Sequence, residues 1–306
     1  MKRTSILPFL ALALLFSACD TTEPSVHEEE VIVESYLIAG ESLGSVFLTT
    51  SIPVDDAYVG GRGGIGNATV SVSLLSADGS VEDVIAYEGV FSASGEYTPT
   101  VDHRVVPGRT YRLEANVPGR PLVTAETVVP GAFDLLDVGP LVLPYRSSDQ
   151  VEFLVTPSAY PGRQAVYIFT IEGLDPRPDN LTPLYFDFLY ENTEDDPATL
   201  DPSEMLDVLV NSSPPINEGT YQDEGDGTLR VGLPWFAVAF YGQNRITMSA
   251  LDDATYDFVR YQQVQAGGST LSPGDIPNVL DRVQNGRGLF GSLTRVQAVA
   301  DVQRDQ

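Results

Sequence analysis

The chain has 306 residues and a large excess of negative charge, with 43 aspartates and glutamates against 17 lysines and arginines. Its formal net charge at pH 7 is -26. Proteins that bind the phosphate backbone of nucleic acids need clustered basic side chains, so this charge excludes nucleic acid as a partner. The hydrophobic fraction of 42% is enough for packed cores, and the length predicts about two globular domains.

The first residues have the pattern of a bacterial export signal. Lys2 and Arg3 form a basic start, and the apolar run from Ile6 to Phe16 is too short to span a bilayer. The run ends at Cys19 in the sequence LFSAC, which resembles the lipobox of bacterial lipoproteins. We therefore predict a signal peptide at residues 1–18, a lipid on Cys19 and an outer-membrane location, with the periplasmic or cell-surface face left open. An ordinary secretory signal that ends beside a cysteine is the alternative.

The mature chain is predicted to contain no lysine. Lys2 is the only lysine, so removal of residues 1–18 takes away two positive charges and lowers the formal charge from -26 to -28. An acidic, lysine-free surface stays hydrated where salt screens its self-repulsion, and we therefore favour a halophilic protein. High genomic GC content is the alternative explanation for the missing lysines, but it does not explain the excess of acids.

Residues 19–30 predict a lipidated cysteine followed by a flexible tether. The segment from Asp20 to Ser25 is polar and contains a proline. His27 and three glutamates follow, and this acidic run resembles the signal that sends some Bacteroidota lipoproteins to the cell surface. A solvated tether with no signalling role is an equal alternative, because runs of charge are usually only solvated.

Residues 31–130 have the pattern of an immunoglobulin-like β-sandwich. Short segments rich in β-branched residues alternate with glycine and proline turns, at a spacing typical of a sandwich of about one hundred residues. The expected strands are 31–38, 45–50, 68–75, 84–87, 110–117 and 122–129. The first two should pair as a hairpin.

Residues 131–306 predict a second β-rich domain that carries one amphipathic helix, so the fold class is mainly all-β. Strands are expected at 150–156, 165–171 and 228–231, and the continuous apolar run 235–240 should be a buried strand. Residues 175–217 predict a long irregular excursion. Apolar residues recur at helical spacing from Leu251 to Val264, which predicts a helix near 252–265 with Asp252 or Asp253 as its cap.

Several short motifs together resemble one family of Bacteroidota outer-membrane lipoproteins. The motifs are the lipobox, VIVESY at 31–36, GNATV at 66–70, PGRTYRL at 107–113, ATYDF at 254–258, IPNV at 276–279 and NGRGLFG at 285–291. The family is catalogued as domain of unknown function 4249. Its members look like outer-membrane lipoproteins that are often encoded beside TonB-dependent receptors. The resemblance implies an accessory role in uptake or envelope assembly and implies no catalytic mechanism.

Two motifs match catalytic or cofactor patterns in spacing but not in context. GESLG at 40–44 fits the nucleophile elbow of serine hydrolases, but a strand is expected after Ser42 in place of a helix, and the only histidines are His27 and His103. GRGGIG at 61–66 fits a dinucleotide-binding fingerprint, and again a strand follows. We therefore expect the first motif to be a turn and the second to be a loop. We expect no enzyme activity from either. Two distant histidines and no free thiol also argue against zinc.

Calcium is the one cofactor that the sequence leaves open. Asp223 and Asp226 offer carboxylate oxygens in the tight turn DEGDG, and further acids crowd residues 191–207. Neither segment has the spacing of an EF-hand loop. A solvated acidic surface is the alternative, and no other cofactor is predicted.

The sequence favours a non-enzymatic, lipid-anchored outer-membrane protein that binds a ligand or partner, beside a TonB-dependent receptor as the resemblance implies. A structural or adhesive cell-surface module is the main alternative, and a hydrolase is a further one. Partner contacts on a sandwich concentrate on long loops. The charged residues expected to make them are Arg62 in the loop 58–67 and Glu191, Glu194, Asp195 and Asp196 in the excursion 175–217.

Replacing Cys19 by serine removes the atom that is predicted to carry the lipid. Cys19→Ser should move the protein from the membrane fraction to soluble fractions, because acyl chains supply the partition free energy that holds it to the bilayer. Fractionation of cells that produce the wild type or the variant, followed by immunoblotting, measures this distribution. A serine variant that stays fully membrane-bound would contradict lipid anchoring.

Overall fold

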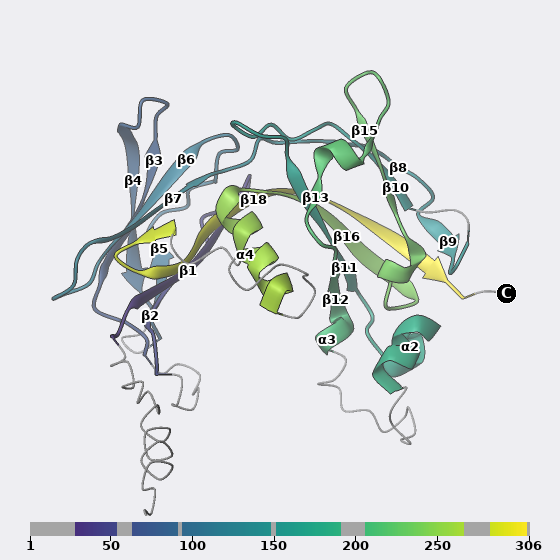
Figure 1. The fold of residues 1–306 in the computed structure, drawn as a ribbon, viewed down its shortest axis with the longest axis horizontal. Coiled ribbons are helices and arrows are strands. Elements are labelled where there is room, and N and C mark those ends of the chain that lie inside the picture. Colours follow the sequence, from purple (N-terminus) through teal and green to yellow (C-terminus); the bar gives the residue numbers. More distant parts are fainter. Residues whose placement is uncertain are drawn as a thin grey trace, which may run out of the picture.

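The computed structural model describes residues 28–53, 63–90, 94–147, 151–190, 206–265 and 282–304. Strands dominate it, and they enclose two cores that lie side by side with helix α4 (Asp253–Gln265) between them (Figure 1). The predicted fold class, mainly all-β with sandwich architecture, is confirmed.

The first core is enclosed by the strands of the N-terminal half. These are β1 (Val31–Ile38), β2 (Val46–Thr50), β3 (Thr69–Leu75), β4 (Val81–Gly89), β5 (Glu96–Pro99), β6 (Thr110–Asn116) and β7 (Val123–Val128). Their order in the sheet is β1-β2-β5-β4-β3-β6-β7, and β1 and β2 pair as the expected hairpin. Every second side chain enters the core, as Val31, Val33 and Leu37 do from β1.

The end of the chain completes this first core. Strand β17 (Val283–Gln284) pairs with β7, and β18 (Arg287–Gln303) begins in parallel pairing with β1. The side chains of Val283 and Phe290 are buried in the first core. Gly288 has a φ of +114°, and a Cβ atom there would lie 2.0 Å from the carbonyl oxygen of Val33. Only glycine therefore lets β18 approach β1 this closely.

The second core lies between two sheets. One is the far end of the large sheet, in the order β12-β11-β16-β18, and the other is the four-stranded sheet β14-β15-β10-β8. The strands are β8 (Leu135–Val138), β9 (Val142–Pro144), β10 (Val151–Val155), β11 (Val166–Gly173), β12 (Val210–Ser212), β13 (Ile216–Asn217), β14 (Gln222–Asp223), β15 (Leu229–Leu233) and β16 (Gly242–Leu251). Phe153 of β10 and Phe169 of β11 meet across the core, with ring centroids 6.1 Å apart.

Strand β18 belongs to both cores. It pairs in parallel with β1 up to Leu293, and from Leu293 to Val302 it pairs antiparallel with β16. Phe290 packs in the first core, whereas Ala300 and Val302 pack in the second. One continuous strand thus fixes the two cores relative to each other. The expected domain boundary at residue 130 stays a prediction, and the structure adds that the last strand contributes to the first core.

Helix α4 confirms the helix expected near 252–265. Asp252 caps it, because the Thr255 backbone N–H donates to Asp252 Oδ1 at 2.8 Å. Asp252 Oδ2 accepts from Thr127 Oγ1 of β7 at 2.7 Å, and that hydroxyl lies 2.6 Å from Ser292 Oγ of β18. Asp252 is 1% exposed, and burial raises the pKa of its carboxyl group. This Asp252 cluster (Thr127, Asp252, Thr255 and Ser292) therefore joins β7, α4 and β18 at the junction of the cores.

Two sequence expectations need correction. Residues 235–240 are not a strand, because Trp235–Ala237 form the short 3-10 helix η4, of which Trp235 and Ala237 pack on the second core. The described parts of 175–217 are more regular than expected. They contain η1 (Pro178–Asn180), α2 (Pro183–Tyr190), α3 (Leu206–Leu209), β12 and β13, and η3 (Glu218–Thr220) follows directly. Pro183 is the first residue of α2, where a missing N–H costs no helical hydrogen bond.

No helix in the described ranges has the length and apolar character needed to cross a membrane.

The raised pKa of Asp252 predicts a pH dependence of stability. The folded state holds this proton more tightly than the unfolded chain does, so the free energy of unfolding should fall as pH rises from about 4 through the raised pKa. Asp252→Asn keeps an oxygen for the Thr255 N–H but cannot ionise. The variant should therefore lose the part of the pH dependence of stability that comes from Asp252. Urea unfolding of both proteins between pH 4 and 7 isolates it, because their difference removes the effect of the other acids.

The exposed Asp137→Asn is the matched control for Asp252→Asn and should keep the wild-type pH dependence. If Asp252→Asn and the wild type show the same pH dependence, the buried carboxyl does not set it.

Candidate functional site

The charged residues predicted to contact a partner lie outside the described residues, as does the predicted lipidation site. These residues are Cys19, Arg62, Glu191, Glu194, Asp195 and Asp196. Their roles stay predictions.

The acidic run at the end of the predicted tether is held by two arginines. Arg120 donates to the Glu29 carbonyl oxygen at 2.6 Å and to Glu29 Oε2 at 2.8 Å. Arg287, at the start of β18, pairs with the carboxylate of Glu30. Glu29 and Glu30, the last two residues of the predicted tether, are therefore part of the folded protein.

The two calcium candidates lie in the exposed turn between β14 and β15. Asp223 Oδ1 accepts from the Gly225 N–H at 2.7 Å, and Asp226 Oδ1 accepts from the N–H and hydroxyl of Thr228 at 2.9 and 2.6 Å. The bonds from Thr228 lower the pKa of Asp226. In the described ranges, no group of three or more histidine, cysteine, aspartate or glutamate side chains is placed to hold a metal. Both carboxylates stabilise the turn, and calcium binding stays an untested alternative.

The serine of the hydrolase-like motif does not face a histidine. Ser42 Oγ donates to Asp102 Oδ1 at 2.5 Å. His103 Nε2 lies 3.0 Å from the Tyr111 hydroxyl, and its Nδ1 lies 3.7 Å from the carboxylate of Asp83. Both ring nitrogens of His103 thus have partners other than Ser42. Ser42 and His103 therefore do not form the serine-histidine pair of a hydrolase.

The glycine-rich motif leads into a strand, as expected. The carbonyl oxygen of Gly63 accepts from the Thr50 N–H at 2.9 Å, and β3 begins at Thr69. The motif therefore has no helix N-terminus after it, and a dinucleotide phosphate would lack that partner.

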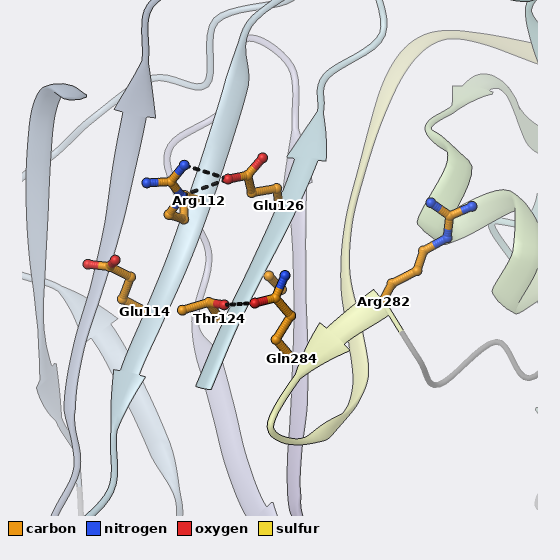
Figure 2. Close-up of a pocket in the computed structure, with 7 residues that line it drawn as sticks. Arg112, Glu114, Thr124, Glu126, Arg282 and Gln284 are labelled. Atoms are coloured by element: carbon orange, nitrogen blue, oxygen red, sulfur yellow. Dashed lines mark hydrogen bonds and ion pairs between the residues drawn. The ribbon is translucent and has the colours of Figure 1, made fainter. Parts of the chain in front are cut away.

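A polar depression of about 520 Å³ lies on the outer face of the first core (Figure 2). Arg112 of β6 pairs with Glu126 of β7 at 2.7 Å, and Arg282, beside β17, donates to Asp257 at 2.8 Å. Figure 2 shows that the two guanidinium groups do not converge on a common point. Because each arginine is already neutralised by its own carboxylate, the depression offers weak attraction for an ionic ligand.

An apolar cleft of about 400 Å³ opens at one side of the second core. Its main lining residues are Phe169, Ile171, Ile216, Tyr221, Leu233 and Phe236. Alternation along β11 and β15 turns Phe169, Ile171 and Leu233 inward from opposite sheets. The aromatic ring of Phe236 in η4 is 54% exposed at the cleft. The two sheets therefore hold an apolar space that solvent can reach.

A few polar groups lie among these apolar side chains. Asn211 Nδ2 donates to the Ala237 carbonyl oxygen at 2.9 Å and to the Tyr185 hydroxyl, which connects β12, η4 and α2. The Tyr221 hydroxyl is buried and has no hydrogen-bond partner among the residues that the structure describes. Burial raises the pKa of Tyr221, so the hydroxyl keeps its proton at neutral pH.

The family model described as "Domain of unknown function (DUF4249)" matches residues 19–298. The chain belongs to this family. The matched range of this DUF4249 protein begins at the predicted lipidation site and includes every lining residue of the apolar cleft. The resemblance seen in the sequence motifs is thus confirmed at the level of the family, while the lipoprotein and Bacteroidota expectations stay predictions. No curated protein matches the chain.

Solved structures similar to this DUF4249 protein are much longer and only distantly similar. Salmonella alpha-2-macroglobulin reacted with methylamine is 12% identical with a TM-score of 0.23, over 90% of this chain and 15% of that chain. Native Escherichia coli alpha-2-macroglobulin is 10% identical with a TM-score of 0.25, over 91% and 14%. A tetra-tandem repeat from the extending region of a large adhesion protein is 12% identical with a TM-score of 0.24, over 90% and 49%. The chain spans less than half of the length of each of these proteins.

The sequence did not indicate the apolar cleft. Its aromatic residues lie in the predicted strand 165–171, the predicted excursion 175–217 and the run 235–240, while Tyr221 lies in a stretch for which the sequence predicts no element. One signal was present, since the α2 sequence PLYFDFLY is aromatic yet contains a single charge, which is unusual for a surface excursion.

Proposed function

We propose that this DUF4249 protein is a non-enzymatic, lipid-anchored outer-membrane protein that binds an apolar ligand or partner segment in the apolar cleft. The observation that carries this proposal is the cleft itself, about 400 Å³ in volume and walled by apolar side chains from two sheets. Clefts of this size, mainly apolar with a few placed polar groups, are the usual form of a binding site. The engagement of Ser42 and His103 with other partners supports a role without catalysis.

Burial of apolar surface would drive binding. An aromatic side chain presents about 200 Å² of surface, so a ligand that covers the exposed half of Phe236 removes about 100 Å² from water. At about 25 cal/mol per Å², this contributes about 2.5 kcal/mol.

The lipid would hold the cleft near a membrane. Because Glu29 and Glu30 are held by arginines, only about ten residues from Cys19 to Glu28 are left as tether, and these reach about 35 Å at most when extended. Figure 1 shows the chain entering β1 on the same side of the molecule as α2 and α3, at the lower edge of the view. Tyr185 of α2 lines the cleft, so the start of β1 and this wall of the cleft lie on one side of the protein.

The family resemblance of the sequence motifs supports a place beside a TonB-dependent receptor. In that place the protein would act as an accessory component of uptake, and the cleft would hold the ligand or a segment of the receptor close to the outer membrane.

A neutral apolar dye tests the cleft without assuming a natural ligand. Nile red should bind the purified mature protein carrying Cys19→Ser, with an increase in fluorescence. Phe236→Ala removes an exposed aromatic wall of the cleft and should weaken binding at least tenfold, because the ring supplies up to about 2.5 kcal/mol of apolar contact. Fluorescence titration measures both affinities.

Phe47→Ala is the matched control, because Phe47 is also an exposed phenylalanine but lies on β2 in the first half of the fold. It should bind Nile red as the wild type does. Equal affinities for Phe236→Ala and the wild type, or no dye binding at all, would contradict the proposed site.

A further inference from the structure

Two strand edges border the apolar cleft, one from each sheet of the second core. Strand β12 is the last strand of the large sheet, and β14, the last strand of the small sheet, pairs with β15 only at Leu229 and Arg230. Ser212 of β12 and Gly232 of β15 line the cleft, and both are exposed. The direction of their backbone groups decides what they offer to a ligand.

Gly232 directs its N–H and C=O away from β10. The Glu224 N–H donates to the Thr228 carbonyl oxygen at 3.1 Å, so Thr228 faces β14, and by antiparallel alternation Gly232 faces the same way. The hydrogen bonds of β10, on the other side of β15, indicate the same direction for Gly232. Glu152, opposite Gly232 on β10, accepts from the Gly139 N–H at 2.7 Å and so faces away from β15. Because β14 ends before this point, the backbone groups of Gly232 have no partner among the described residues.

Ser212 has the same arrangement on the opposite rim. The Ser213 N–H donates to the Phe169 carbonyl oxygen at 2.8 Å, so Ser213 faces β11 and its neighbour Ser212 faces outward. Its backbone groups also lack a partner in the ranges that the structure covers. The cleft therefore combines apolar walls with free backbone donors and acceptors on its rims. An extended peptide supplies the complement of both, because its backbone pairs with a strand edge while alternate side chains point to one face.

The charges around the cleft select the charge of that peptide. Glu218 and Asp223 lie two positions after the lining residues Ile216 and Tyr221, and neither has an ion-pair partner in the described part of the chain. The nearest arginine in sequence, Arg230, is already paired with Glu152 at 3.0 Å and with Glu224 at 2.9 Å. The net charge of the whole chain, -26, is negative like these side chains. A basic peptide is therefore attracted and an acidic one repelled.

We propose that the ligand of the apolar cleft is an extended basic peptide segment that adds to β15 as a strand. One peptide residue pairs its N–H and C=O with those of Gly232. Its two neighbours in the peptide point inward, because side chains alternate along a strand and the inner face of β15 carries Val231 and Leu233. Basic residues outside this triplet lie near the acidic side chains. This inference rests on the proposed function and names the class of ligand.

The capped peptide Arg-Leu-Ser-Leu-Arg is a direct probe, with the serine placed to pair with Gly232 and the leucines placed to enter the cleft. Isothermal titration at low salt should show binding to the wild type. N-methylation of the serine nitrogen removes the paired N–H and should weaken binding at least tenfold. Replacing both arginines by glutamate should weaken it to a similar degree, with a difference that shrinks as salt is raised.

Gly232→Pro tests the same hydrogen bond from the protein side, because proline lacks the N–H that faces the peptide. It should lose peptide binding at least tenfold and keep Nile red binding, which reports an intact cleft. Gly232→Ala keeps the N–H and is the matched control that should bind both probes. If Gly232→Pro does not fold, judged by circular dichroism, the N-methylated peptide decides alone.

The outcomes separate this inference from the function on which it rests. Equal affinity for the plain and N-methylated peptides overturns strand addition, and so does Nile red binding without any peptide binding. The proposed cleft function survives both results. Absence of Nile red binding contradicts the cleft function itself. Equal affinity for the arginine and glutamate peptides overturns the proposed charge preference.

Discussion

The two cores share strand β18, and the relative position of everything else depends on that sharing. The strand pairs with β1 in one core and with β16 in the other, and the Asp252 cluster joins β7, β18 and α4 where the strand passes between them. A local opening of β18 would expose both cores at once, so neither half can move independently without a large loss of apolar burial. The second sandwich has one open side, and that open side is the apolar cleft.

The sequence correctly predicts those strands that have one solvent-exposed face. Strands β1 and β6 alternate between buried and partly exposed residues, and the helix at 252–265 shows its apolar spacing together with its aspartate cap. Strand β16 was not predicted, because its last six residues, Ile246–Leu251, are all buried and include polar ones. Residues 235–240 show the converse error. Their continuous apolarity matches the burial of Val238, Ala239 and Phe240, but it cannot distinguish a strand from the 3-10 helix η4, in which Phe236 is exposed.

The candidate site was beyond sequence reasoning for a geometric reason. It exists because β14 pairs only as far as Gln222 and Asp223 while β15 continues to Leu233, and because β12 ends its sheet. Strand ends of this kind follow from pairing between distant segments, which no local pattern encodes. Sequence reasoning selected charged loop residues as the partner site, whereas the structure draws attention to backbone edges and aromatic walls. Among the described candidates, Asp223 and Asp226 prove to be turn residues with local hydrogen bonds.

The central claim is that the open side of the second sandwich, between Ser212 and Gly232, is where this DUF4249 protein binds. Amide hydrogen exchange, followed by mass spectrometry with and without the arginine peptide, tests it most directly. The claim predicts slower exchange in peptides that cover residues 210–214 and 231–234, with no change in the β3–β4 hairpin of the first core. Slower exchange confined to the first core, or no change at a saturating peptide concentration, would contradict it.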